Sequence, residues 1–235
     1  MDVSQQGEGI VDVTTHLVDL VQWECFPEQT INYANDIQLT TVRRWTTPMT
    51  LSDFKAITKL DSFPAYLKKN VTNDTILDVY SNGEINYRIK GVHAKVSVIW
   101  NYKAAEGAGD THSSLMRGTK ANLVIRQTAE QNYKPALYIE PVASDAGYKT
   151  TIEQQFKTLQ AKYPGVELKP SGKGWEVVIP DKYKEGHEEH FARVMQKFLQ
   201  YLQNKNMPAW EVPNMLAKYF TTTKALELAL QNKQQ

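Results

Sequence analysis

The chain has 235 residues with 27 basic and 26 acidic side chains, so its formal net charge of +1 gives no electrostatic footprint for nucleic acid or an anionic membrane. Hydrophobic residues make up 41% of the chain, as in ordinary soluble globular proteins, and the single cysteine, Cys25, excludes an intrachain disulfide framework. No apolar run reaches the roughly 18 residues of a membrane span and the start does not resemble a signal peptide, which leaves the compartment open between cytoplasm and periplasm.

The first predicted element is a helix from Asp12 to Phe26, in which one apolar and one mixed stripe repeat at helical spacing before Pro27 stops the pattern. A strand is expected at 37–45. Two short helices are expected within 50–69, with Thr50 as the cap of the first.

The middle of the chain is predicted to be rich in strands. Asn82-Gly83 is a strong turn signal, and it predicts a hairpin between strands at 75–80 and 84–90. The remaining strands are expected at 92–102, 112–117, 121–127, 136–142, 166–169 and 174–179, and the remaining helices at 148–163, 185–204 and 210–231. Strands joined by hairpins and flanked by helices favour an α+β fold with one open, mostly antiparallel sheet and helices packed on one face.

Asp12 and His16 are the first candidates for chemistry. They are four residues apart, so on a helix they lie one above the other on the same face. A carboxylate beside an imidazole orients the ring and favours its protonated form, which suits a general acid or base near neutral pH. The alternative is that both side chains are merely solvated or hydrogen-bonded on the polar side of an amphipathic helix.

The segment Gly7 to Trp23 resembles the start of the second domain in the glucose–fructose oxidoreductase and inositol dehydrogenase family (Gfo/Idh/MocA), where an Asp-x-x-x-His-x-x-Asp helix is followed by a Trp. Asp12, His16 and Asp19 match that spacing. Residues 115–124, 190–211 and 225–229 also resemble segments of that family. Within the family, Trp45 and the stretches 60–63 and 91–94 resemble a bacterial subgroup called the putative oxidoreductase C-terminal domain.

The resemblance implies the fold of the C-terminal domain of glyceraldehyde-phosphate dehydrogenase and a hydride transfer between a sugar or polyol CH–OH group and NAD or NADP. It also implies that His16 is the general acid/base, that Asp12 is its partner, and that Asp19 has a structural or substrate-binding role. Residues 1–235 are then a single substrate-binding, catalytic and oligomerisation domain, and the chain alone is expected to be inactive.

The chain departs from that family in lacking a nucleotide-binding part. No Gly-rich turn lies between a parallel strand and a helix, and no Glu-Lys-Pro segment occurs. The N-terminal Rossmann domain is therefore expected to be absent from this chain, and the nicotinamide cofactor to be held mainly by that domain. The sequence leaves the choice of NAD or NADP, and of the sugar, open.

Other polar residues are weaker candidates. His93 and His112 lie on predicted strands that could face the same cleft as His16, and Arg117 lies beside the turn at 118–120, so all three are possible substrate contacts. Each has the alternative of a solvated or structural role. His187 and His190 have helical spacing but lack a third ligand, so no metal site is expected.

The expected partners are a sugar-like substrate, the N-terminal nucleotide-binding domain and a second copy of the chain, because the uncovered face of a single open sheet would need a cover. Nucleic acid and membrane are not expected. The rival interpretation is a non-catalytic carbohydrate-binding or assembly module that keeps the fold without the chemistry.

Overall fold

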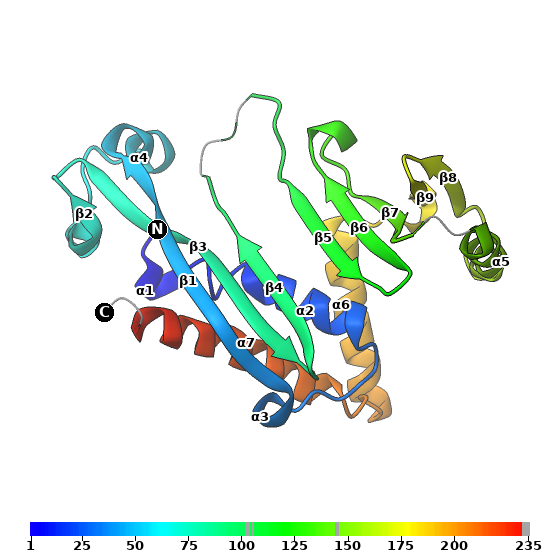
Figure 1. Ribbon diagram of the computed structural model, residues 1–235. Helices are drawn as coiled ribbons and strands as arrows, with labels where there is room; N and C mark the ends of the chain where they lie inside the picture. Colours follow the sequence, from blue (N-terminus) through cyan, green and yellow to red (C-terminus); the bar gives the residue numbers. More distant parts are fainter. Residues whose placement is uncertain (102–103, 105, 144–145, 232–235) are drawn as a thin grey trace. The chain divides into compact units, whose positions relative to one another are not determined.

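The computed structural model describes residues 1–101, 104, 106–143 and 146–231 (Figure 1). It confirms the α+β class with antiparallel strand pairing. The chain divides into two compact units, the first made of residues 1–102 and 204–235 and the second of residues 103–203. The strands were expected in one sheet, but the described strands form two, a four-stranded sheet A in the first unit and a five-stranded sheet B in the second.

Sheet A is built around its longest paired strands. The central strand β3 (Ile76–Ile89) pairs antiparallel with β1 (Ile37–Thr50) on one side, and with β4 (Val92–Val98) and the short β2 (Val71–Thr72) on the other. The helical elements of this unit are α1 (Val3–Gln6), α2 (Thr14–Cys25), α3 (Tyr33–Asp36), α4 (Leu51–Thr58), the 3₁₀ helix η1 (Ala65–Asn70) and α7 (Glu211–Gln231).

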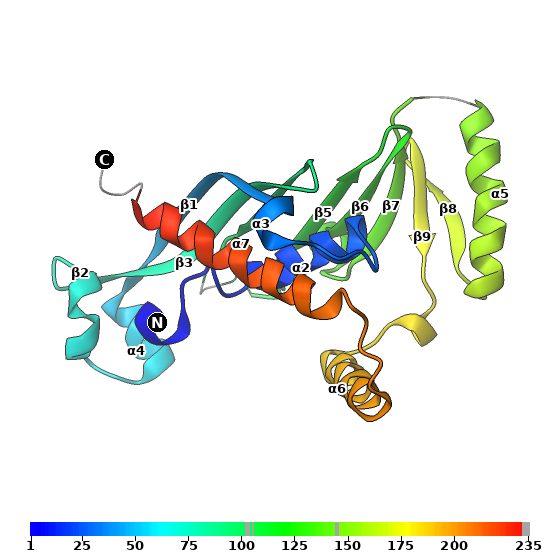
Figure 2. The ribbon, with the colours of Figure 1, turned by 90° about the horizontal axis from the view of Figure 1, so that it is seen from below.

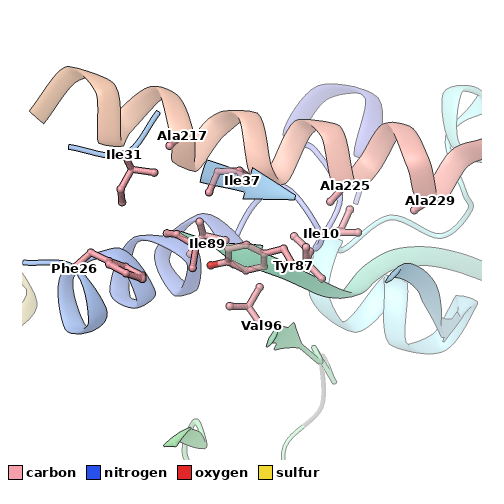
Figure 3. Packing of buried hydrophobic residues seen from close by; sticks show 12 residues of the cluster. Ile10, Phe26, Ile31, Ile37, Tyr87, Ile89, Val96, Ala217, Ala225 and Ala229 are labelled. Atoms are coloured by element: carbon pink, nitrogen blue, oxygen red, sulfur yellow. The ribbon is translucent and has the colours of Figure 1, made fainter. Parts of the chain in front are cut away.

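Two of these helices cover one face of sheet A. α7 packs on β1, while α2 packs on β4 and against α7 (Figure 2). Figure 3 shows Ala217, Ala225 and Ala229 of α7 facing the core, where their small side chains allow the helix to lie close to the sheet. The sheet contributes the fully buried side chains of Ile85, Tyr87 and Ile89.

The prediction of a hairpin at Asn82-Gly83 is wrong, because both residues lie inside the continuous strand β3. They pair with Trp45 and Arg44 of β1, respectively. Gly83 is needed there for close packing, since a Cβ would lie 2.6 Å from the Cα of Ile10. Asn82 is 1% exposed; its amide donates to Thr47 Oγ1 at 2.9 Å, and its oxygen accepts from the Trp100 amide at 2.8 Å. The residue pair Asn82-Gly83 therefore reflects tertiary packing and does not form a turn.

The opposite face of β3 and β4 is polar. Glu84 accepts from Arg43 at 3.2 Å and lies 2.8 Å from the Lys95 ammonium. Hydrogen bonds from Lys95 and Arg43 hold the pKa of Glu84 below its usual range. Charged and polar side chains of this kind are stable in water.

Tyr87 offers a test of how this core is packed. Its hydroxyl is buried and, among the described residues, has no hydrogen-bond partner, while burial raises its pKa. Because an unsatisfied buried polar group costs about 1–3 kcal/mol, we expect Tyr87→Phe to raise the free energy of unfolding by about 1 kcal/mol. Urea denaturation measures this free energy of unfolding. Tyr183→Phe is the control and should lower the free energy of unfolding, since the Tyr183 hydroxyl donates to Pro164 O at 3.2 Å. A loss of stability in Tyr87→Phe would contradict the expectation.

The second unit contains sheet B, in the order β5 (His112–Arg117), β6 (Ala121–Gln127), β7 (Ala136–Pro141), β9 (Gly174–Val178) and β8 (Glu167–Ser171). The two hairpins predicted here, around 118–120 and 171–174, are confirmed. α5 (Ala146–Lys162) packs on β8, and a small core forms between Phe156 of the helix and Ile139, Trp175 and Val177 of the sheet. The other helical elements are η2 (Ala129–Gln131), η3 (Asp181–Tyr183) and α6 (His187–Asn204), whose last residue falls in the first unit.

Candidate functional site

The candidate site is a line of polar and aromatic side chains along α2, which we call the α2 stripe: Asp12, His16, Asp19 and Trp23. Asp12 precedes the first helical residue, but the chain is already helical there. The Asp12 amide donates to Glu8 O at 3.0 Å, and Val13 has φ −62° and ψ −31°. The predicted arrangement of Asp12 and His16 one turn apart is therefore present.

The stripe is turned outward because the other side of α2 is anchored in the core. Thr14, Val18 and Gln22 are 0%, 0% and 1% exposed. The Thr14 hydroxyl donates to Ile10 O at 2.5 Å, which ties the first turn of the helix to the segment before it. Rotation of the helix about its axis would bring the fully buried Val18 into water, so the direction in which His16 points is fixed by packing.

The segment that leads into α2 is held by direct backbone contact with β3. The Gly9 amide donates to Tyr80 O at 3.0 Å. A Cβ on Gly9 would lie 1.9 Å from the carbonyl oxygen of Ser81. Only glycine fits at this position, and the close approach fixes where the turn before Asp12 begins.

A buried ion pair holds the same segment from the side. Arg44 of β1 donates to Glu8, and the two side chains are only 8% and 10% exposed. The Arg44 guanidinium also lies 4.0 Å from the centre of the Tyr80 ring. Neither Glu8 nor Arg44 was predicted to matter, because the sequence alone does not bring residues 36 positions apart together.

Among the described residues, the side chains of Asp12 and His16 make no hydrogen bond or ion pair, and both are exposed. An imidazole and a carboxylate are thus available on one surface of a rigidly held helix. Such a pair can accept and return a proton, and can bind hydroxyl groups of a ligand.

Asp19 has a partner that the sequence did not reveal. Its carboxylate lies 3.5 Å from the ammonium of Lys218 on α7, and the side chains are 38% and 19% exposed. This contact links the two helices beside the stripe. Trp23, 58% exposed one turn further on, adds a large aromatic surface at the end of the stripe.

Of the other predicted contacts, His93 lies in the first unit with the α2 stripe, while His112 and Arg117 lie in the second unit. Val96 of β4 is buried against α2 and α7, so His93, three positions earlier in the alternating strand, points to the opposite face of sheet A. It is exposed there beside Arg88. His112 and Arg117 lie on β5 in the second unit, half-buried and exposed respectively, and β4 and β5 are not neighbours in one sheet.

No cluster of three or more His, Cys, Asp or Glu side chains suited to a metal ion occurs among the described residues. His187 lies 3.8 Å from Glu188 and packs on the ring of Phe191.

Within the same described ranges, no helix has the length and apolar character needed to cross a membrane.

In Rossmann-type domains, dinucleotides bind where a Gly-rich turn joins a parallel strand to a helix. All strand pairs in the part of the chain that the structure describes are antiparallel, so that geometry does not occur there. The glycines at 107 and 109 lie in the connection between β4 and β5, and those at 172 and 174 lie in the β8–β9 hairpin. These glycines therefore do not form the strand–helix turn of a Rossmann-type dinucleotide site.

Comparison with known proteins gives one family and one close structure. The model of the family described as "Putative oxidoreductase C terminal domain" matches residues 1–230. A crystal structure described as that of a putative oxidoreductase from Parabacteroides merdae ATCC 43184 is 56% identical, with a TM-score of 0.94. The match covers 98% of this chain and 53% of that chain, so this chain spans about half the length of that relative. A search of curated proteins gives no match. With a family match over nearly its whole length, the chain belongs to the family of oxidoreductase C-terminal domains.

Proposed function

We propose that this chain is the substrate-binding and catalytic part of an NAD- or NADP-dependent oxidoreductase of the glucose–fructose oxidoreductase and inositol dehydrogenase family, acting on a CH–OH group of a sugar or polyol. The observation that carries the proposal is the free imidazole of His16 with the carboxylate of Asp12 one turn before it, on the outward side of a helix whose inner side is fully anchored. Membership of an oxidoreductase family supports the reaction class.

In this proposal, His16 takes the proton from the substrate hydroxyl oxygen during oxidation and returns it during reduction. Removal of that proton raises the electron density at the carbinol carbon and so lowers the barrier to loss of hydride. We assign to Asp12, which makes no hydrogen bond or ion pair with His16 among the described residues, the role of orienting the ring and stabilising its protonated form when the ligand is bound. We assign Trp23 and the Asp19–Lys218 pair to binding of the sugar body, through the ring face and through hydroxyl groups respectively.

The nicotinamide, when bound, accepts or donates the hydride. We assign the cofactor mainly to a nucleotide-binding domain outside these residues, and this chain alone is expected to be inactive. His93, His112 and Arg117 remain proposed substrate contacts only if an assembled protein brings their surfaces to the ligand.

The natural gene product, with whatever further domain it carries, is the protein to assay. We expect it to reduce NAD or NADP with at least one member of a sugar and polyol panel, followed by the absorbance of the reduced nicotinamide. His16→Asn should lower kcat by about 10²- to 10⁴-fold, the usual contribution of general acid–base catalysis, while sugar and cofactor binding persist. Asp12→Asn should lower kcat with little change in KM, because it acts through His16.

Glu24→Gln is the matched control, since Glu24 is exposed in the last turn of the same helix and should leave kcat unchanged. Retention of full turnover by His16→Asn would refute the catalytic role of this residue. If neither form turns over and both bind the sugar equally, the rival function holds, that of a non-catalytic carbohydrate-binding or assembly module.

A further inference from the structure

Sheet B carries a pocket of about 350 Å³ that the proposed function does not use. All of its described lining residues belong to the second unit. Ile139 of β7 points into the core with Phe156 of α5, so its neighbours Tyr138 and Glu140 point to the other face of the sheet, where the pocket lies. Small-molecule pockets usually have volumes of about 300–1,000 Å³, so this one suits a ligand the size of a single sugar ring.

The polar side chains of the pocket come from two neighbouring strands. Asn122 of β6 pairs with Glu140 of β7, so both lie on the same face, and Arg126 and Tyr138 occupy alternate positions on that face. The Arg126 guanidinium donates to Glu140 at 2.6 Å and lies 5.0 Å from the centre of the Tyr138 ring. The two charged side chains are 39% and 40% exposed, so the pair is held in place and is still open to a ligand.

The β8–β9 hairpin forms one wall of the pocket and is pressed against β7. A Cβ on Gly174 would lie 2.0 Å from the carbonyl oxygen of Ile139 and 2.9 Å from the ring of Pro141. Trp175, the next residue, is 9% exposed and belongs to the core beside α5. The wall is therefore fixed by main-chain contact and by the core of the second unit.

The polar groups of the pocket combine donors with acceptors. Arg126 and Lys173 can only donate, and the ionised Glu140 can only accept. The Asn122 amide and the Ser171 hydroxyl can do both. Because a hydroxyl group also donates and accepts, neighbouring hydroxyls of a sugar ring can donate to the carboxylate while they accept from the guanidinium or the amide.

The charges of the pocket disfavour an anionic ligand. Arg126 is already paired with Glu140, and the carboxylate would repel any anion placed on the guanidinium. Lys173 is exposed at the hairpin, where water and salt screen its ammonium. A neutral ligand with several hydroxyl groups therefore fits these side chains better than a carboxylate or a phosphate does.

We propose that this pocket of sheet B binds a neutral polyhydroxylated ring, a sugar unit or a cyclitol, through the Arg126–Glu140 pair and Asn122. Its residues differ from those of the α2 stripe. The proposal therefore does not depend on the catalytic role of His16.

Fluorine resonance separates the two sites. The natural gene product is labelled with 5-fluorotryptophan, and the signals of Trp175 and Trp23 are assigned from Trp175→Phe and Trp23→Phe. Methyl β-glucoside and myo-inositol are the probes. We expect at least one of them to shift the Trp175 signal saturably, since Trp175 lines the pocket, while Trp23 reports on the α2 stripe.

Two substitutions test the polar contacts. Glu140→Gln should raise the dissociation constant read from the Trp175 signal by about 10-fold or more, because the pocket loses its charged acceptor. Asn122→Ala should also weaken binding while it leaves the ion pair between Arg126 and Glu140 in place. The second variant keeps the test valid if the first one alters the shape of the pocket.

Glu84→Gln is the matched control, because sheet A repeats the same local arrangement outside the pocket. Glu84 accepts from Arg43 at 3.2 Å, and the Arg43 guanidinium lies 4.8 Å from the centre of the Trp45 ring. This variant should leave the dissociation constant unchanged.

Weaker binding in Glu140→Gln or Asn122→Ala, with an unchanged control, would support the proposal. A Trp175 signal that moves with neither probe would overturn it, as would an unchanged dissociation constant in both variants. A shift of Trp23 alone would support sugar binding at the α2 stripe and refute the pocket. Tighter binding of glucuronate or inorganic phosphate than of the neutral probes would refute the ligand class.

Discussion

Gly9→Ala is expected to unfold the first unit or to destabilise it by more than about 3 kcal/mol, at the upper end of overpacking effects. The added Cβ would lie 1.9 Å from Ser81 O and 2.3 Å from its carbonyl carbon. Both are backbone atoms of β3, in the interior of a paired sheet, and they cannot move aside as the end of a flexible side chain can. The free energy of unfolding from urea denaturation, or the yield of folded protein, measures the effect.

Gly186→Ala is the control for this substitution. A Cβ at Gly186 would have its nearest neighbour, Glu189 Oε2, at 3.8 Å, which is ordinary contact, and the Gly186 amide would still donate to Glu189. The control should change stability by less than about 1 kcal/mol. Equal stability of the Gly9→Ala and Gly186→Ala proteins would show that the segment before α2 is not pressed against β3 in solution.

Arg44→Met should destabilise the protein by about 3–5 kcal/mol, because it leaves the Glu8 carboxylate buried without its counter-charge. The pair is already incompletely satisfied. Among the described residues, Glu8 Oε2 and Arg44 Nε have no hydrogen-bond partner. Removing the guanidinium also removes the contact with the Tyr80 ring at 4.0 Å.

The double variant Glu8→Leu with Arg44→Met separates the two contributions. Replacing both charges by apolar groups is often neutral, so we expect the double variant to recover most of the loss seen in the single one. Lys224→Met is the exposed comparison, since Lys224 pairs with Glu227 at 2.7 Å on the surface of α7 and should cost at most about 1 kcal/mol. A single-variant loss as small as this would show that Arg44 and Glu8 are not buried together.

The sequence was most informative where local pattern and tertiary context agree. The helix predicted at 12–26 is present as α2, and the strands at 112–117 and 121–127 have the predicted bounds. In both cases the amphipathic period or the turn chemistry acts over a few neighbouring residues. The line of Asp12, His16 and Asp19 on one side of α2 follows from helical spacing alone.

The failures have a tertiary cause. The turn signal at Asn82-Gly83 is overridden by the contact of Gly83 with Ile10 and by the buried hydrogen bonds of Asn82, both of which involve residues distant in sequence. The division of the strands into two sheets, the Asp19–Lys218 pair and the Glu8–Arg44 pair were equally beyond local pattern, because each depends on segments far apart in the chain.

The contact of the segment before α2 with β3 also affects which substitutions the surface of α2 can accept during evolution. Gly9 touches the backbone of β3 and Gly83 touches the backbone of Ile10, so the position of the helix that carries His16 depends on main-chain atoms. Substitutions of exposed side chains on α2 can then alter the surface beside the imidazole without displacing it. A fixed imidazole and a freely variable surface beside it are thus physically compatible in one short helix.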